Sequence, residues 1–501
     1  MSARRAMIVL AACALAQLAG AALAQERVRV ASKSFTESVI LGEIARLLLE
    51  AEGFTAGHER GLGGTRLVFN ALESGSVDAY PDYTGTIVNE ILASEGPEDY
   101  AAAREILRER GLRVTAPLGF NNTYAIGVLP ETAERLGLET ISDLRDHPGL
   151  ELAFNNEFLE RADGWPSLRS TYRLPQTGVR GLEHDLAYRA IAAGQTDAMV
   201  VYTTDAEIAE LGLVLLEDDL EHFPTYEAVV VYRAELSERA PRAAAALRSL
   251  AGTLDEARMS ALNRRVKIDG EPEAVVAADF VRETFGVDSA VAVASRFDRV
   301  LLRTWEHLYL VAIPMGAGVV VSLPLGIAAA RTRRTGQGIL AAVGILQTIP
   351  SLALLVFMIR PLGIGAAPAI AALFLYSLLP MVRATATGIA GIAPGVEESA
   401  EALGLSWWTK LLRIELPLAA PSVLSGVKTA TVILIGFATL GGFIGAGGYG
   451  DPILTGIRKD DLGLMLEGAI PAAAMAIAAQ GLFELLERLV VPRGLRLRRP
   501  E

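Results

Sequence analysis

Five long apolar stretches in the C-terminal part of the chain constrain its fold most. They run over 305–330, 339–359, 367–390, 423–444 and 464–490. Each approaches or exceeds the roughly 20 residues that a helix needs to cross about 30 Å of hydrocarbon. Buried helices of a soluble domain are the alternative, but five such stretches so close together are rare in soluble proteins. We therefore expect an all-helical domain with about five membrane spans.

The residues before position 289 have a different pattern. Short apolar strands are expected at 28–32, 152–154, 198–201 and 228–232, and apolar residues recur at helical spacing over 38–51 and 185–193. Charged side chains are spread through this half, as on a solvated surface. The whole chain averages 51% hydrophobic and 21% charged residues because it combines a highly apolar second half with a more charged first half. The first half is therefore predicted to be a mixed α/β domain.

The N-terminus has the features of an export signal. Arg4 and Arg5 precede an apolar stretch over 6–24 that ends in a small-x-small cleavage pattern, so 1–24 is predicted to be a signal peptide. A loose lipobox ending at Cys13 and an uncleaved membrane anchor are the alternatives. All three place the residues after position 25 outside the cytoplasm.

Basic residues predict the same orientation independently. If the first half is outside, Arg331 and its basic neighbours, the loop at 392–420 and the arginines after residue 492 all fall inside. Arg360 and the basic pair at 458–459 are exceptions. We expect a multi-pass protein of the cell (inner) membrane with an extracytoplasmic (periplasmic) first domain and a cytoplasmic C-terminus.

The loop at 392–420 carries the most specific motif. We expect a helix, a turn at Gly404, and a second helix stopped by Pro417. On patterning alone, this helix pair could be an ordinary amphipathic connector. Its spacing resembles the EAA loop of ABC importer permeases, with Ser399 in place of the usual first alanine. The matching positions are Glu398, Ala400, Gly404, Ile414, Leu416 and Pro417.

This resemblance covers nearly all of 304–495, and the stretch at 347–353 is similar to permeases of the osmoprotectant branch. It implies that the loop docks on a separate ATPase subunit. The chain has no Gly-Lys-Ser or Gly-Lys-Thr, so it lacks a P-loop and cannot hydrolyse ATP by that route. We expect a homodimer with two copies of the ATPase, with neither a cofactor nor a metal in this chain.

Four tyrosines lie at predicted strand ends in the first half: Tyr83, Tyr124, Tyr202 and Tyr226. Each alone is more often a packing residue, but α/β clefts gather their ligand contacts at strand ends. Aromatic rings attract a quaternary ammonium group by about 0.5–2 kcal/mol each. That group has no N–H to donate, so ring faces suit it. The pattern is typical of a cage for such a cation.

The motifs at 35–37, 80–86, 119–124 and 163–166 resemble glycine betaine, carnitine and choline binding proteins. The resemblance implies a two-lobed periplasmic binding protein fold of type II over 26–288. Lobe 1 would cover about 26–121 and 226–288, lobe 2 about 122–225, and 289–303 would be a linker. It also implies that the four tyrosines form the cage. Further ligand-binding positions would be Lys33, Thr86 and Arg161 for a carboxylate, and Asn122, where some members have Asp.

These features favour one function over two others. An extracytoplasmic receptor for a quaternary ammonium compound would be fused to an ABC importer permease. A ligand-gated channel would not need an ATPase-docking loop, and a membrane-tethered enzyme would need a catalytic set that we do not find. Another trimethylated zwitterion, such as the histidine betaine ergothioneine, remains an alternative substrate. The net charge of −12 argues against nucleic-acid binding.

Overall fold

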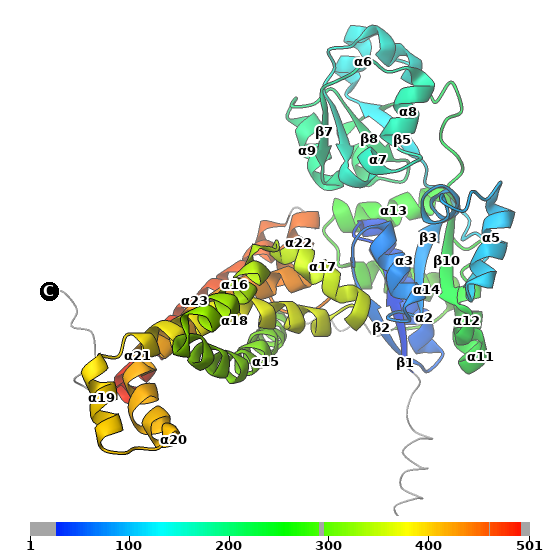
Figure 1. Cartoon of the computed structure of the whole chain (residues 1–501). Coiled ribbons are helices and arrows are strands. Elements are labelled where there is room, and N and C mark those ends of the chain that lie inside the picture. The colour runs from blue at the N-terminus through cyan, green and yellow to red at the C-terminus, as the bar shows by residue number, and fades with distance from the viewer. Residues whose placement is uncertain (1–26, 290–294, 460, 492–501) are drawn as a thin grey trace, which may run out of the picture. The chain divides into compact units, whose positions relative to one another are not determined.

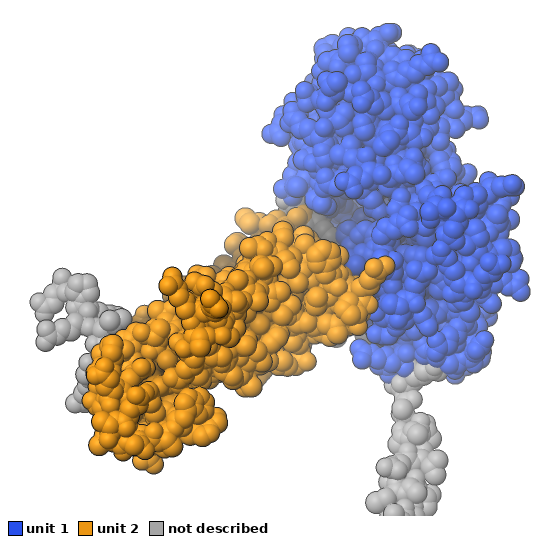
Figure 2. Space-filling model, in the orientation of Figure 1, with its two compact units in different colours: residues 1–291 blue, residues 292–501 orange. Residues whose placement is uncertain are grey.

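The computed structural model describes residues 27–289, 295–459 and 461–491. Its contacts separate two compact units, 1–291 and 292–501 (Figure 2). The predicted signal peptide at 1–24 and the arginines after residue 492 lie outside the described residues.

Unit 1 contains two five-stranded sheets with helices packed on them (Figure 1). The first sheet has the order β2-β1-β3-β10-β4. Its strands are β1 Arg27–Ala31, β2 Thr55–Glu59, β3 Ala79–Tyr83, β4 Leu112–Val114 and β10 Ala228–Arg233. Its main helices are α2 Thr36–Ala51, α3 Thr65–Glu73, α5 Tyr100–Glu109, α11 Ala234–Arg239, α12 Pro241–Arg248, α13 Glu256–Lys267 and α14 Glu273–Phe285.

The second sheet has the order β7-β6-β8-β5-β9. Its strands are β5 Tyr124–Val128, β6 Leu152–Asn155, β7 Val179–Leu182, β8 Ala198–Tyr202 and β9 Val214–Leu216. Its helices are α6 Pro130–Leu136, α7 Asn156–Glu160, α8 Trp165–Tyr172, α9 His184–Ala192 and α10 Ala206–Leu211. The two lobes are joined by adjacent chain segments, because Asn121 pairs with Glu227 in an isolated antiparallel bridge.

Strand register explains how distant tyrosines meet. Strands β5 and β8 are antiparallel, and Tyr124, the first residue of β5, lies opposite Tyr202, the last residue of β8. In the other sheet β10 is antiparallel to β3, and Ala228 lies opposite Tyr83. Both pairs therefore lie at strand ends, on the side where the segments between the lobes begin.

Unit 2 is helical. Four helices are long and apolar enough to cross a membrane, and a bent pair brings the number to as many as five, within the residues searched. The helices are α15 Arg296–Arg331, α16 Arg333–Thr348, α17 Ser351–Leu362, α18 Ala366–Ala390, α19 Pro394–Ala402, α20 Trp407–Lys410, α21 Leu416–Ala438, α22 Gly450–Lys459 and α23 Leu462–Val490. Residues 296–303, predicted as linker, belong to α15 instead.

Small residues let these helices approach closely, as in many membrane proteins. A Cβ on Gly326 would lie 2.4 Å from the Cβ of Thr385, and one on Gly426 would lie 2.4 Å from that of Ala384. Both contacts are tighter than a real Cβ tolerates. Helix α18 therefore packs against α15 and α21 through glycines that cannot be enlarged without displacing a neighbour.

Prolines act differently at two places in this unit, and the prediction that Pro417 stops a helix was wrong. The stretch at 339–359, expected as one of the five spans, contains a 94° bend between α16 and α17. Ile349 is extended, as expected for a residue before proline, and this ends α16. Pro417 does not stop its helix: a π-helical turn at Leu411–Glu415 precedes it, and α21 continues as far as Ala438. The wider turn removes the α-helical hydrogen bond that proline would break.

Candidate functional site

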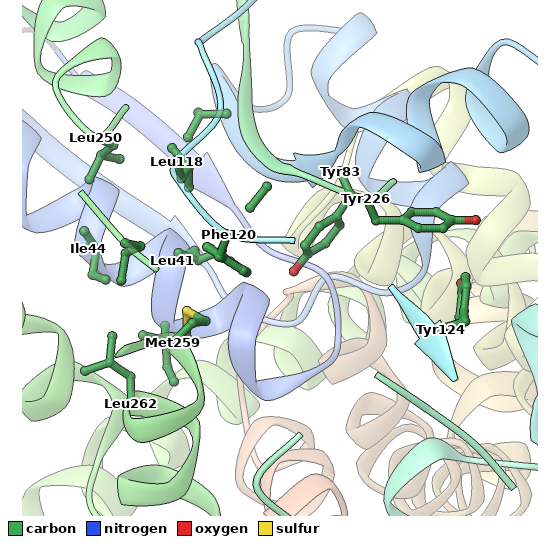
Figure 3. Close-up of a cluster of buried hydrophobic side chains, with 14 of the residues drawn as sticks. Leu41, Ile44, Tyr83, Leu118, Phe120, Tyr124, Tyr226, Leu250, Met259 and Leu262 are labelled. Atoms are coloured by element: carbon green, nitrogen blue, oxygen red, sulfur yellow. The ribbon is translucent and has the colours of Figure 1, made fainter. Parts of the chain in front are cut away.

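Tyr124 contacts two of the other predicted cage tyrosines. The ring of Tyr124 lies 5.5 Å from that of Tyr202 and 5.3 Å from that of Tyr226, the latter edge to face. Figure 3 shows Tyr124, Tyr226 and Tyr83 gathered at one end of the buried cluster, away from Leu250 and Ile44. The arrangement leaves ring faces and edges from both lobes close together.

Tyr83 joins this group through Phe35, which was not predicted as a site residue. Phe35 lies 6.2 Å from the ring of Tyr83 and 5.5 Å from that of Tyr202. Phe35 lies just before α2, and apart from the motif at 35–37 nothing in the sequence indicates that it belongs to the site. The hydroxyl of Tyr202 accepts a hydrogen bond from the amide of Asn155 at 3.0 Å, which fixes that ring further.

The two predicted carboxylate-binding cations are each paired with an aspartate. Arg161 donates from Nε and Nη2 to the two oxygens of Asp163, both at 2.7 Å, and its guanidinium lies 5.7 Å from the ring centre of Tyr124. Lys33 donates to Asp82 at 2.5 Å and lies 5.5 Å from the ring centre of Tyr83. Neither aspartate was predicted as a site residue.

Each aspartate also accepts a phenol. Tyr226 donates to Asp163, and Tyr80 donates to Asp82, both at 2.5 Å. Burial acts to raise the pKa of Asp163, but the Arg161 guanidinium and the Tyr226 hydroxyl hold it below its ordinary value. Asp163 therefore links the predicted anion-binding arginine to the cage.

Glu157 connects the two lobes. Its carboxylate, on α7 of the second lobe, accepts the N–H of Thr65 at 3.1 Å, at the start of α3 in the first lobe. Burial acts to raise its pKa, whereas the charges of Lys33 and Arg161 hold it below the ordinary value. Lys33 and Arg161, the two cations predicted to bind a ligand carboxylate, therefore already act on a carboxylate of the protein itself.

Thr86 and Asn122, the remaining predicted ligand positions, are both buried. Thr86 ends the short helix at Thr84–Thr86 that follows β3. Asn122 donates its side-chain amide to Glu37 at 2.8 Å and its main-chain N–H to Tyr226 at 3.0 Å. Its side chain is therefore directed at a carboxylate that was not predicted to be part of the site.

A cavity of about 430 Å³ opens beside Asp163. Val88, Asn89 and Pro97 line it from the first lobe, and Ala162 and Ser167 line it from the second. It is large enough for a small organic molecule. Asp163, which also lines the cavity, accepts the hydroxyl of Tyr226.

The predicted coupling loop forms two short helices around a tight turn. Gly404 has a φ of +67°, and its N–H and that of Leu405 bond back to Glu401 and Ala400, the double bond of a Schellman motif. Glu398 is exposed and Ala400 is buried. Trp407 and Trp408 are largely exposed. The loop thus presents a charged and aromatic surface.

One ion pair ties this loop to the first span. Glu415, buried between the predicted positions Ile414 and Leu416, accepts two hydrogen bonds from the guanidinium of Arg331, at 3.0 and 2.5 Å. Arg331 is the last residue of α15. The loop and this end of α15 are therefore fixed to each other.

Comparison with protein families matches both halves. Residues 26–283 match a family described as the substrate binding domain of ABC-type glycine betaine transport systems. Residues 322–494 match one described as the inner membrane component of binding-protein-dependent transport systems.

Relatives of known function also match each half separately. The glycine betaine/carnitine/choline transport system permease protein OpuCB of Bacillus subtilis is 42% identical over 196 residues, 39% of this chain and 90% of the relative. The glycine-betaine-binding protein of Pseudomonas aeruginosa is 36% identical over 296 residues, 56% of this chain and 95% of the relative. A crystal structure of a glycine betaine/carnitine/choline ABC transporter is 30% identical, covering 51% of this chain and 98% of that one, with a TM-score of 0.44.

Proposed function

This chain belongs to the osmoprotectant ABC importer family as a glycine betaine-type substrate-binding domain fused to its permease domain, and on this premise we propose how it captures and transports its ligand. The ligand is a quaternary ammonium compound of the glycine betaine, choline or carnitine class. Its cationic head would lie against Tyr83, Tyr124, Tyr202 and Tyr226. The contact of the Tyr124 ring with those of Tyr202 and Tyr226 is the observation that carries the proposal.

The carboxylate of a betaine would bind at Arg161 and Lys33, with Thr86 and Asn122 in the surrounding wall. Arg161 uses only Nε and Nη2 on Asp163, and within the described residues its Nη1 has no hydrogen-bond partner. Lys33 uses one of its three donors on Asp82. A ligand carboxylate can therefore join both ion pairs without breaking them.

Calorimetric titration of the full chain in lipid nanodiscs tests the ligand class. Glycine betaine, choline, carnitine, proline betaine and ergothioneine should be compared under the same conditions. We expect saturable binding of at least one of the first four. The relatives named above transport or bind this class, so ergothioneine as the best ligand would overturn the assignment. Absence of binding by all five would overturn the quaternary ammonium proposal itself.

The driving subunit would be a separate P-loop ATPase, in two copies, on a homodimer of this chain. The coupling positions Glu398, Ala400, Gly404, Ile414, Leu416 and Pro417 would form its docking surface. ATP would bind to the partner, so this chain needs no cofactor of its own. Reconstitution with and without the ATPase decides this point. Ligand flux without the ATPase would favour the channel alternative, and a purified active complex with one copy of this chain would refute the dimer.

We propose that the binding domain faces the outside and that the coupling loop and C-terminus face the cytoplasm. The chain has one cysteine, Cys13, so single-cysteine variants are simple to make once it is replaced. Ser406 is exposed in the coupling loop, and Ser74 lies at the surface end of α3 in the binding domain. In intact cells or spheroplasts, an impermeant maleimide should label S74C and not S406C. The opposite pattern would contradict this orientation.

A further inference from the structure

Glu37 is a buried carboxylate close to the predicted cage. It is the second residue of α2 and is 3% exposed. Four side chains donate to it: Tyr83 at 2.6 Å, Asn122 at 2.8 Å, Thr204 at 2.5 Å and Asn263 at 2.9 Å. They come from β3, the segment between the lobes, the loop after β8, and α13. Both lobes therefore converge on one carboxylate.

All four donors are uncharged, which distinguishes Glu37 from other buried acids of this domain. Asp82 is paired with Lys33 and Asp163 with Arg161. Glu43, on the same helix as Glu37, is surrounded by Arg46, His58 and Arg60. Among the residues that the structure describes, no Lys, Arg or His lies within 4.0 Å of the Glu37 carboxylate.

A buried carboxylate without a counter-charge is costly, and hydrogen bonds from neutral donors offset only part of that cost. Burial raises the pKa of Glu37 above its ordinary value, and the four hydrogen bonds act to lower it, because a carboxylate offers acceptors and no proton to donate. A cation that binds nearby would stabilise the ionised form further, so the site is suited to receive one.

We infer that Glu37 supplies the negative charge that selects the cationic head group of the ligand, acting through the phenol of Tyr83 and the amide of Asn122. This inference rests on the proposed quaternary ammonium ligand. The phenol that donates to Glu37 belongs to a predicted cage residue, so the charge polarises that ring toward the ligand. Cation–π attraction is electrostatic and strengthens as the ring becomes more electron-rich.

Choline and its neutral carbon isostere, 3,3-dimethylbutan-1-ol, isolate the effect of charge. The two molecules have the same shape, and neither titrates. The full chain should bind choline more tightly than the isostere. In Glu37→Gln this preference should fall at least about tenfold, the size expected for losing one charge interaction at an effective dielectric constant near 20. A purely structural role would weaken both ligands equally and leave the ratio unchanged.

Glu43→Gln is the matched control. It removes another buried charge from the same helix, but its partners are Arg46, His58 and Arg60 rather than cage residues. It should lower thermal stability and leave the choline preference unchanged. A fall in the ratio equal to that of Glu37→Gln would show a general field effect and overturn the inference.

The double variant Glu37→Gln with Asn122→Asp exchanges the acid and the amide across their 2.8 Å hydrogen bond. It keeps one charge and one amide in the same place, so it remains informative if the single variant does not fold. We expect it to recover most of the choline preference. A folded double variant without that preference, or a folded Glu37→Gln with the parental ratio, would overturn the inference. Failure of the parent chain to bind choline, glycine betaine or carnitine would instead refute the proposed ligand class.

Discussion

Arg161 and Asp163 form a two-bond ion pair whose carboxylate is also bound by the hydroxyl of Tyr226. The guanidinium that is predicted to bind a ligand carboxylate is thus held by a partner that also positions a cage ring. Anion recognition and cation recognition are therefore mechanically connected. A change at either end should affect the other.

Removing a cage ring should weaken ligand binding. Tyr124→Ala and Tyr202→Ala should each reduce affinity for choline or glycine betaine from a few-fold to about 30-fold, because one ring contributes about 0.5–2 kcal/mol. Calorimetry on the full chain measures this effect. Tyr124→Phe is the control: it keeps the ring, and within the described residues the Tyr124 hydroxyl has no hydrogen-bond partner, so affinity should change less than about threefold. If both alanine variants bind the ligand like the parent, these tyrosines do not form a cage for it.

Removing Arg161 should discriminate between ligands. Arg161→Ala should weaken glycine betaine by about tenfold or more, since a charge-assisted pair of hydrogen bonds is lost. Choline has no carboxylate and should lose less. Equal losses for the two ligands would mean that Arg161 acts only by holding Asp163 and Tyr226.

Breaking the Arg331–Glu415 pair should uncouple the membrane domain from the ATPase. Arg331→Glu leaves the buried Glu415 facing a second acid in place of its counter-charge, which destabilises this contact. Ligand-stimulated ATP hydrolysis should fall strongly while ligand affinity stays unchanged. The charge exchange Arg331→Glu with Glu415→Arg should recover part of the activity.

The pair Lys428–Glu484 provides a comparison, because it is longer, at 3.7 Å, and more exposed. Glu484→Gln should have little effect on coupled hydrolysis. If Arg331→Glu behaves like Glu484→Gln, the loop is not tied to α15 in a way that matters for transport.

Gly404 should tolerate no β-branched residue. Its φ of +67° costs an L-residue about 1–2 kcal/mol, although a Cβ there would meet no neighbour. Gly404→Val should therefore change the angle between α19 and α20 and abolish coupled uptake, with ligand binding intact. Gly395→Ala, where the space is also open but φ is not positive, should transport normally. Normal uptake by Gly404→Val in normal membrane amounts would show that the loop is a plain connector.

The stability of the second lobe should depend on pH through His184. Its ring stacks on Tyr202 at 4.3 Å and bonds to Asp205 at 2.7 Å. Burial acts to lower its pKa, but Asp205 raises it above the ordinary value of 6.5. A raised folded-state pKa means that the protonated pair stabilises the fold below pH 6.5, and that this contribution disappears as pH rises through the folded-state value.

His184→Gln should therefore lose more thermal stability relative to the parent at pH 6 than at pH 9. The difference between the two proteins in the same buffers is the measurement. A stability loss that is the same at both values would show that His184 remains neutral.

The sequence predicted which tyrosines come together better than it predicted the residues that surround them. Tyr124 and Tyr202 could be predicted because strand ends gather ligand contacts and tyrosine is conspicuous there. Phe35 and Glu37 lie before and in the first turn of a helix, where an aromatic residue and an acid are common for other reasons. Asp82 and Asp163 belong to the motifs at 80–86 and 163–166. The sequence did not predict their ion pairs, because a surface ion pair and a buried one have the same sequence pattern. Burial depends on tertiary packing.

The membrane domain shows the same limit. The number of apolar stretches predicted the candidate spans, because the length of a span is set by the bilayer. What each proline does depends on the preceding turn. At Pro350 an extended Ile349 ends the helix, whereas at Pro417 a π-helical turn allows it to continue. Hydropathy does not predict whether a helix ends or continues at a given proline.

The bend between α16 and α17 has a consequence for movement. Two hydrogen bonds fasten it to α18: Gln347 donates to the main chain of Tyr376, and the hydroxyl of Tyr376 donates to the carbonyl of Ile349 that the bend leaves open. In hydrocarbon such a carbonyl has no water to bind, so releasing the contact would cost several kcal/mol. The bent pair and α18 should accordingly shift as one rigid body during the transport cycle, leaving rearrangement to the joints with α15 and α21.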